Sequence, residues 1–332
     1  MRARSFSHPG PRSWQRWLAG AVLALLATHL GFASAAADEA KVEHLGLELI
    51  GNLEGAGGNL AAARAVVLIV HDALAFHGAD GPSALQAALA GHRQPSLAIT
   101  LGLGIDARRK PFDCTFEHDH RDSDAAQEIA VWVRWLVSQG AKAVVLAGEG
   151  RGALQVAMQA ESSDASTDPA GSSTDAPTPG PAVQGLVLIA PAPSDPPARI
   201  ADYRARFASD LGQVLADAHR VAGDAGEDTS IDVPGFLSCA RSRVTAGAFL
   251  DAYDQDRAPD LVRLLRARGL PVLAFLADGD PRRAELDAAA TPVPGGSTIR
   301  VEMLSTGPAT SDLMQQPATA ARIAGFVARL RP

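Results

Sequence analysis

The stretch 148–152, Gly-Glu-Gly-Arg-Gly, has the spacing of a sharp turn that presents one side chain for chemistry. An apolar run, 143–147, precedes this turn, and a helix-like run, 153–158, follows it. In a strand–turn–helix of this kind, small flanking residues let the backbone close up, and the central side chain is the attacking group. The central residue here is Gly150, which has no oxygen, sulfur or carboxylate. The sequence therefore predicts the frame of a nucleophilic site without its nucleophile.

Alternating strands and helices are expected to position this turn, because the apolar, β-branched runs of the chain are separated by helical patterns. Strands are predicted at 65–70, 96–101, 144–147, 183–189, 271–276 and 297–303, with an edge strand or hairpin at 42–53. Helices are predicted at 83–89, 122–138 and 320–330, with Ser83 and Thr319 as N-caps. This order predicts an α/β fold with a mostly parallel sheet that is covered by helices on both faces.

Two segments interrupt the alternation. Residues 162–181 are rich in Ser, Thr, Asp, Pro and Gly, which predicts a disordered loop, with a linker between domains as the weaker alternative. Residues 194–269 are mostly helical in pattern, most clearly over 200–221. We expect this second segment to form a helical cap region over the strand ends.

The N-terminus has the features of a secretory signal. Four arginines precede an apolar stretch at 17–32, and small residues follow at 33–37. This pattern predicts a signal peptide over residues 1–37, with an N-terminal membrane anchor as the alternative. Its removal would leave a single domain at 38–332, which is expected to be periplasmic or secreted, and no later segment is long and apolar enough to span a membrane.

Charge and composition exclude several functions. Removal of residues 1–37 would take away four arginines and no acidic residue, so the net charge would fall from −7 to −11. An acidic chain without a basic stripe argues against nucleic acid and against an anionic membrane surface as partners. No cofactor is expected. The two cysteines, Cys114 and Cys239, permit one disulfide in an oxidising compartment, or they are two buried thiols.

From about residue 45 to residue 330, the chain resembles the α/β-hydrolase superfamily. The stretches that carry this resemblance are 101–106 followed by 113–114, the helix from 122, the turn 148–152, and 235–239 with 243–246. More narrowly, the chain resembles an uncharacterised group of secreted bacterial hydrolase-like proteins with a degenerate nucleophile turn. The resemblance implies a Ser, acid and His triad in that order along the chain.

The resemblance allows each site position to be tested. The serine position is Gly150, flanked by Gly148 and Gly152, and the acid position is Asp280, with Asp278 in reserve. The alternative for both acids is a solvated turn that caps a helix starting at Pro281. The histidine is expected in the loop 304–312, but the sequence contains no histidine after His219.

The loop after the first core strand begins His71-Asp72, and in the superfamily this loop supplies an amide to the oxyanion hole. A carboxylate at the Asp72 position would oppose a developing oxyanion, and Glu149 adds a second negative charge. The alternative is that both side chains point to solvent. His71 and His77 are expected to be loop or packing residues.

Two further chemistries are possible. Cys114 or Cys239 could act as a displaced nucleophile, although neither lies at the turn. Cys114, His118 and His120 are candidate metal ligands, with a solvated loop that leads into the helix from Asp122 as the alternative.

The sequence thus predicts a catalytically inactive pseudo-hydrolase that binds a small molecule or a protein partner. The alternatives are an active ester or amide hydrolase with displaced catalytic groups, and a metal-binding protein.

Overall fold

The computed structural model describes residues 38–55, 59–162, 183–290, 299–304 and 312–330. The predicted signal peptide, 1–37, lies outside these residues. The predicted disordered loop also lies outside them, apart from Ser162, which ends a helix.

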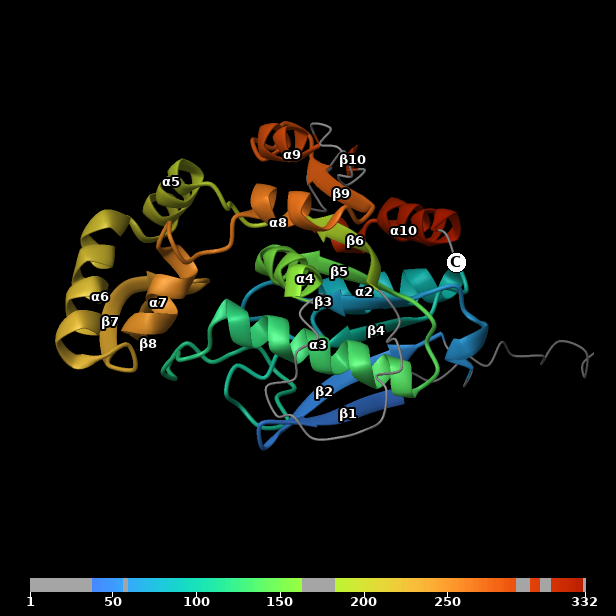
Figure 1. Cartoon of the computed structure of the whole chain (residues 1–332), viewed down its shortest axis with the longest axis horizontal. Helices are drawn as coiled ribbons and strands as arrows, with labels where there is room; N and C mark the ends of the chain where they lie inside the picture. Colours follow the sequence, from blue (N-terminus) through green and yellow to red (C-terminus); the bar gives the residue numbers. More distant parts are fainter. Residues whose placement is uncertain (1–37, 56–58, 163–182, 291–298, 305–311, 331–332) are drawn as a thin grey trace, which may run out of the picture. The chain divides into compact units, whose positions relative to one another are not determined.

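Eight strands form one sheet in the order β1-β2-β4-β3-β5-β6-β9-β10 (Figure 1). The strands are β1 (Asp38–His44), β2 (Leu47–Glu54), β3 (Val66–Val70), β4 (Ser96–Ile99), β5 (Val144–Glu149), β6 (Val183–Ile189), β9 (Val272–Ala277) and β10 (Ile299–Leu304). Neighbouring strands from β4 to β10 are parallel, whereas β1 and β2 form an antiparallel hairpin at one edge. The mostly parallel sheet and its edge hairpin are confirmed.

Both faces of the sheet are apolar and covered, as expected for parallel strands. Along β3, Val66 and Val70 belong to one buried cluster and Ile69 to another, because successive side chains point to opposite faces. The first cluster includes side chains of α3 (Asp122–Ser138), α4 (Arg151–Ser162), α8 (Leu261–Arg268) and α9 (Arg283–Ala289); the second includes those of α2 (Asp80–Gly91) and α10 (Pro317–Arg329).

Both predicted N-caps are wrong, because each helix begins earlier. Helix α2 starts at Asp80, so Ser83 lies inside it and donates its N–H to Ala79 O. Helix α10 starts at Pro317, and the Thr319 hydroxyl donates instead to Leu313 O in a short 3₁₀ turn, η2 (Leu313–Gln315). A proline in each first turn accounts for the earlier start, since proline lacks only an N–H that has no helical partner there.

The cap region differs from its prediction in two ways. The stretch with the clearest helical pattern, 200–221, is divided between α5 (Pro196–Phe207) and α6 (Leu211–Ala225). The break falls at Ala208, whose φ is +50°, and Asp210 then caps α6 by accepting the Gly212 N–H at 2.8 Å.

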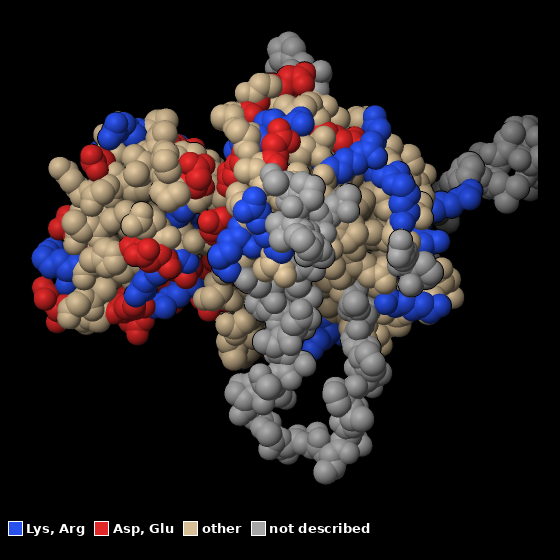
Figure 2. Space-filling view, turned by 45° about the horizontal axis from the view of Figure 1, so that its top comes forward, with Lys and Arg blue, Asp and Glu red and all other residues tan. Residues whose placement is uncertain are grey.

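The cap also contains a hairpin that was not predicted, formed by β7 (Ser230–Phe236) and β8 (Cys239–Thr245), which leads into α7 (Ala246–Tyr253). Its apolar side chains join those of α5, α6 and α7 in a separate buried cluster that includes Val233, Phe236 and Val244. Each strand has few apolar residues, so its alternation of apolar and polar residues is hard to distinguish from the helical patterns on either side. Over the cap surface, at the left of Figure 2, acidic and basic side chains are mixed. Arg206 and Asp202 of α5 form one ion pair of the cap.

The loop after β4 fastens the cap to the sheet domain. Cys114 in this loop and Cys239 in β8 form a disulfide, which settles the question that the sequence left open. Four residues later, His118 donates its N–H to Arg243 O at 2.9 Å, and its carbonyl accepts the Thr245 N–H at 2.8 Å. One covalent bond and two backbone hydrogen bonds therefore hold β8 against the loop.

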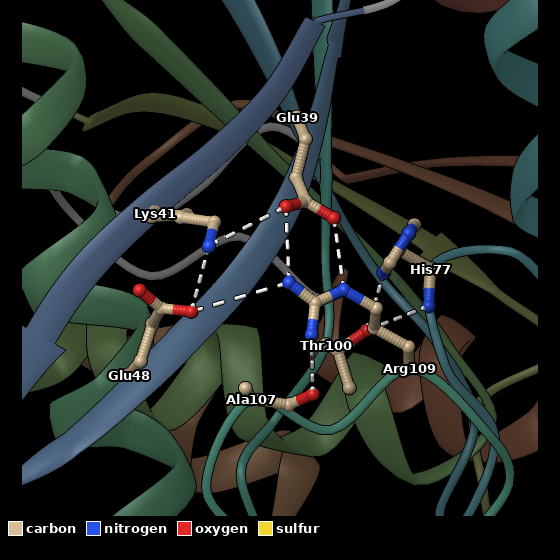
Figure 3. A network of polar contacts seen from close by, with 7 residues as sticks. All are labelled: Glu39, Lys41, Glu48, His77, Thr100, Ala107 and Arg109. Carbon is tan, nitrogen blue, oxygen red and sulfur yellow. Dashed lines mark hydrogen bonds and ion pairs between the residues drawn. The ribbon is translucent and has the colours of Figure 1, made fainter.

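The same loop is fastened to the edge hairpin by charged side chains (Figure 3). Arg109 of the loop donates from Nε and Nη2 to the Glu39 carboxylate at 2.9 and 3.0 Å. Within the hairpin, Lys41 of β1 donates to Glu48 of β2 at 2.9 Å. Exposed pairs such as these add little to stability. Nearby, the His77 ring lies 2.6 Å from Thr100 Oγ1, a packing role as expected from the sequence.

No helix in the described part of the chain has the length and hydropathy needed to cross a membrane.

The disulfide should stabilise the fold substantially, because it closes a loop with a sequence separation of 125 residues. We expect the double substitution Cys114→Ser/Cys239→Ser to lower the free energy of unfolding by about 4 kcal/mol, measured by urea denaturation. As a control, a thiol reductant should destabilise the wild-type protein and leave the variant unchanged. Equal stability of the two proteins would contradict the prediction.

Candidate functional site

The sharp turn predicted at 148–152 is present between β5 and α4, and its outer glycines are required by close packing. A Cβ on Gly148 would lie 2.3 Å from Gly152 O, and a Cβ on Gly152 would lie 2.5 Å from His71 O. Both distances are shorter than any real Cβ contact. The central residue, Gly150, has a φ of +55°, a left-handed conformation that glycine adopts without strain.

The place of the missing central side chain is filled by Asp72. Its Oδ1 accepts the Arg151 N–H at 2.7 Å, at the first turn of α4. A Cβ on Gly150 would lie 2.0 Å from the same Oδ1 and 2.4 Å from Cγ of Asp72. The Asp72 carboxylate therefore fills the space that a side chain at position 150 would need. It also accepts the hydrogen bond of the next backbone N–H, that of Arg151.

His71 holds the Asp72 loop in this position. The His71 side chain is fully buried, its Nε2 accepts the Leu101 N–H at 3.1 Å, and its Nδ1 lies 3.0 Å from Asp72 O. Because Nε2 accepts, the ring proton is on Nδ1, which donates to that carbonyl. Burial, and then the charge of Arg108, lower the pKa of His71 to about 3. The ring is thus a neutral structural group.

Glu149 does not point to solvent but pairs with a second carboxyl, that of Asp312. Burial, and then the negative charges of Asp312 and Asp72, raise the pKa of Glu149 to about 8. At neutral pH the Glu149 carboxyl is therefore protonated and donates to Asp312. The Asp312 carboxylate also accepts the Met314 N–H at 2.8 Å and a Gln315 side-chain N–H at 2.8 Å.

The sequence prediction missed the role of Asp312, although this residue ends the stretch in which the histidine was sought. The rest of that stretch, 305–311, lies outside the described residues. Asp312 contacts Glu149, which is 163 positions earlier in the chain, and no local sequence pattern indicates a contact over this separation.

The predicted acid, Asp280, is engaged by Arg282, another residue that the prediction missed. The Arg282 guanidinium contacts both oxygens of the Asp280 carboxylate and also donates to Ala190 O and Pro191 O. Burial alone would raise the pKa of Asp280, but hydrogen bonds from Arg282 outweigh it and lower the pKa. Asp280 Oδ1 also accepts the Arg282 N–H at 2.9 Å within the turn. The predicted capping of a helix from Pro281 is wrong, because α9 begins at Arg283 and has no side-chain cap. The reserve candidate, Asp278, is exposed.

Three predicted positions, Asp72, Gly150 and Asp280, meet in one cleft of about 1020 Å³. Its walls come from the turn, the loop after β6, helix α5 of the cap, and the start of α9. The lining is mostly small and aliphatic, with five carboxylates and two guanidinium groups. The cleft thus has the size of a small-molecule site.

Arg151 connects this cleft to the cap. Its Nε donates to Asp122 Oδ1 at 2.9 Å, and Gln155 on the next turn of α4 donates to the same oxygen at 2.9 Å. The Asp122 N–H in turn donates to Asp251 Oδ2 of α7 at 2.7 Å. The Arg151 side chain therefore points away from the cleft, and only its backbone N–H faces Asp72.

The three candidate metal ligands each interact with other groups of the protein. Cys114 is in the disulfide and has no thiolate to offer. His118 stacks between Phe112 and Phe236, with ring centroids 3.9 and 5.0 Å away, and His120 Nε2 lies 3.3 Å from Glu128 Oε1. Over the described residues, no group of three or more His, Cys, Asp or Glu side chains is arranged to hold a metal ion.

The raised pKa of Glu149 predicts a pH-dependent stability. The carboxyl is protonated in the folded chain up to pH about 8 but ionises near 4.5 when unfolded, so folding takes up a proton between these values. The free energy of unfolding should therefore fall as pH rises through this window, by up to ~1.4 kcal/mol per pH unit. In Glu149→Gln this contribution should disappear, as measured by urea unfolding at pH 5 and pH 8. The exposed Glu43→Gln serves as control, and an unchanged pH dependence in Glu149→Gln would contradict the assignment.

Comparison with known proteins identifies the fold of the chain. No family model and no curated protein matches the sequence. Among solved structures, Est1E from Butyrivibrio proteoclasticus with bound ferulic acid superposes with a TM-score of 0.57, at 12% identity over 88% of this chain and 98% of that one. The Pyrococcus furiosus esterase Pf2001 gives 0.54, at 10% identity over 90% of this chain and 91% of that one. Identities this low show the fold alone, and the chain has the fold of the α/β-hydrolase superfamily.

Proposed function

We propose that this chain is a periplasmic or secreted binding protein that keeps the α/β-hydrolase fold and its cleft but does not carry out acyl transfer. The observation that carries the proposal is the contact between the Asp72 carboxylate and the Arg151 N–H. In acyl transfer, the amide after the nucleophile stabilises the oxyanion of the tetrahedral intermediate. A resident carboxylate on that amide competes with the oxyanion and repels it.

The other catalytic positions support the same proposal. Gly150 offers no nucleophile, and the sequence has no histidine after His219. Asp280, which would orient a histidine, has its carboxylate bound by Arg282. A catalytic triad needs a histidine hydrogen-bonded both to the nucleophile and to the acid.

The proposed location rests on two features. A disulfide is typical of oxidising compartments, and residues 1–37 have the pattern of a signal peptide. The proposed partner is a small molecule held in the cleft. The acidic net charge of the chain disfavours nucleic acid as a partner.

Restoring the missing serine should damage the fold before it restores chemistry. We expect Gly150→Ser to lower the free energy of unfolding by about 2–4 kcal/mol, because the new Cβ would clash with Asp72 and a non-glycine residue would adopt positive φ. Adding Asp72→Ala should recover at least ~1 kcal/mol of this loss, since the two sites are in contact. Chemical denaturation of the single and double variants measures this coupling.

Gly279→Ser is the matched control for this experiment. Gly279 has a φ of +77° and no atom within 4 Å of an added Cβ, so its substitution carries the backbone cost without the clash. If Gly150→Ser and Gly279→Ser were equally destabilised, the carboxylate would not fill the nucleophile position.

Activity assays test the proposal directly. The wild-type protein should neither hydrolyse p-nitrophenyl esters and thioesters above the buffer rate nor react covalently with a fluorophosphonate probe. The Asp72→Ala/Gly150→Ser variant should also remain inactive, because it still lacks a general base. Turnover by the wild-type protein that is abolished by a substitution in the cleft would establish the alternative, an active hydrolase with displaced catalytic groups.

A further inference from the structure

The charges that line the cleft are unevenly balanced. Five carboxylates face two guanidinium groups, and both guanidinium groups are engaged: Arg282 by Asp280, and Arg206 by Asp202, with an Nε–Oδ2 distance of 3.1 Å. Arg206 also donates to Leu237 O at 3.1 Å. Neither arginine is therefore available to an anionic ligand, and the remaining charge on the walls is negative.

Two of the other carboxylates are held by neutral partners. Asp195 accepts the Ala198 N–H at 3.1 Å as the N-cap of α5. Glu285 accepts a hydrogen bond from the buried Ser194 hydroxyl. Both carboxylates also interact with the positive charge of Arg199, a buried arginine of α5, so each has a structural role and a cation nearby.

Asp72 is the exception. Its Oδ1 is fixed by the Arg151 N–H, but no cationic side chain of the described chain pairs with it, and the Arg151 guanidinium is bound to Asp122. The Asp72 side chain is exposed to the cleft, and the neighbouring Glu149 is neutral at physiological pH. The cleft thus contains one anchored carboxylate whose charge lacks a counter-ion.

Part of the cleft wall is aliphatic. Ala198, Ala201 and Ala205 lie on one face of α5, and Val262 of α8 lines the same cleft. Aliphatic carbon atoms suit an alkyl body. They do not suit a bare divalent ion, which needs several oxygen ligands.

We propose that the cleft binds an organic ammonium ligand, with its charged nitrogen on Asp72 and its alkyl body along the α5 wall. The inference rests on the proposed binding function and names the ligand class. Charge complementarity carries it: the carboxylate is held in place before binding, so little conformational freedom is lost when the ammonium group docks. A bond of this kind, between charged groups, is stronger than one between neutral groups.

Isothermal titration calorimetry at pH 7 with three probes of equal chain length tests the proposal. Hexylamine, which is cationic at this pH, should bind more tightly than 1-hexanol, and hexanoate should bind most weakly. Asp72→Asn keeps the shape of the side chain and an acceptor for the Arg151 N–H. This variant should weaken hexylamine binding about tenfold and leave 1-hexanol unchanged.

Asp217→Asn is the matched control, since it removes one exposed carboxylate of α6 that does not line the cleft. This variant should bind all three probes as the wild-type protein does. The proposal is overturned if hexanoate binds as well as hexylamine, if Asp72→Asn leaves hexylamine binding unchanged, or if none of the probes binds. These probes contain no ester or amide bond, so the result is independent of the hydrolysis assays, which test the proposed function itself.

Discussion

The hydrogen bond from the Arg151 N–H to the Asp72 carboxylate is the interaction on which the site depends. The first turn of a helix presents unpaired N–H groups and a partial positive charge, and it therefore attracts an anion. In an enzyme of this fold, the anion is generated by the reaction and disappears when product forms. Here the anion belongs to the chain itself, and the buried His71 ring keeps its backbone in place. Helix α4 is thereby stabilised permanently, at the expense of a free oxyanion site.

Arg151 links this arrangement to the cap. Its backbone holds Asp72, while its side chain binds Asp122 at the start of α3, which in turn is bonded to Asp251 of α7. The position of the amide, the orientation of α3 and the placement of the cap are therefore connected through one residue. Three successive hydrogen bonds therefore connect Asp251 of the cap with Asp72 in the cleft.

Much of the fold could be predicted because its signals are local. Strands β3, β4, β5, β6 and β9 are predominantly apolar runs, and α3 begins and ends at the predicted residues, 122 and 138. The turn at 148–152 could be identified from its glycines, because a Cβ at either outer position would clash with neighbouring backbone atoms. The hairpin β7–β8 was missed because its short strands carry few apolar residues.

The chemistry of the site was less predictable because it depends on contacts between distant segments. The sequence identified Asp72, Glu149 and Asp280 as positions of interest but did not reveal their partners. Asp312 meets Glu149 only because the start of η2 lies at the carboxyl end of β5. Arg282 follows Asp280 closely in the sequence, but its other partners, the carbonyls of Ala190 and Pro191, lie 92 and 91 positions earlier in the chain. Spacing along the chain does not encode these encounters.

The bond between Cys114 and Cys239 converts the middle of the polypeptide into a covalent ring. This ring contains the turn 148–152, helix α4, the segment 163–182 and most of the cap. A single peptide-bond break anywhere within it leaves two pieces that are still joined through sulfur. The sheet domain and the cap would therefore remain parts of one molecule after such a break.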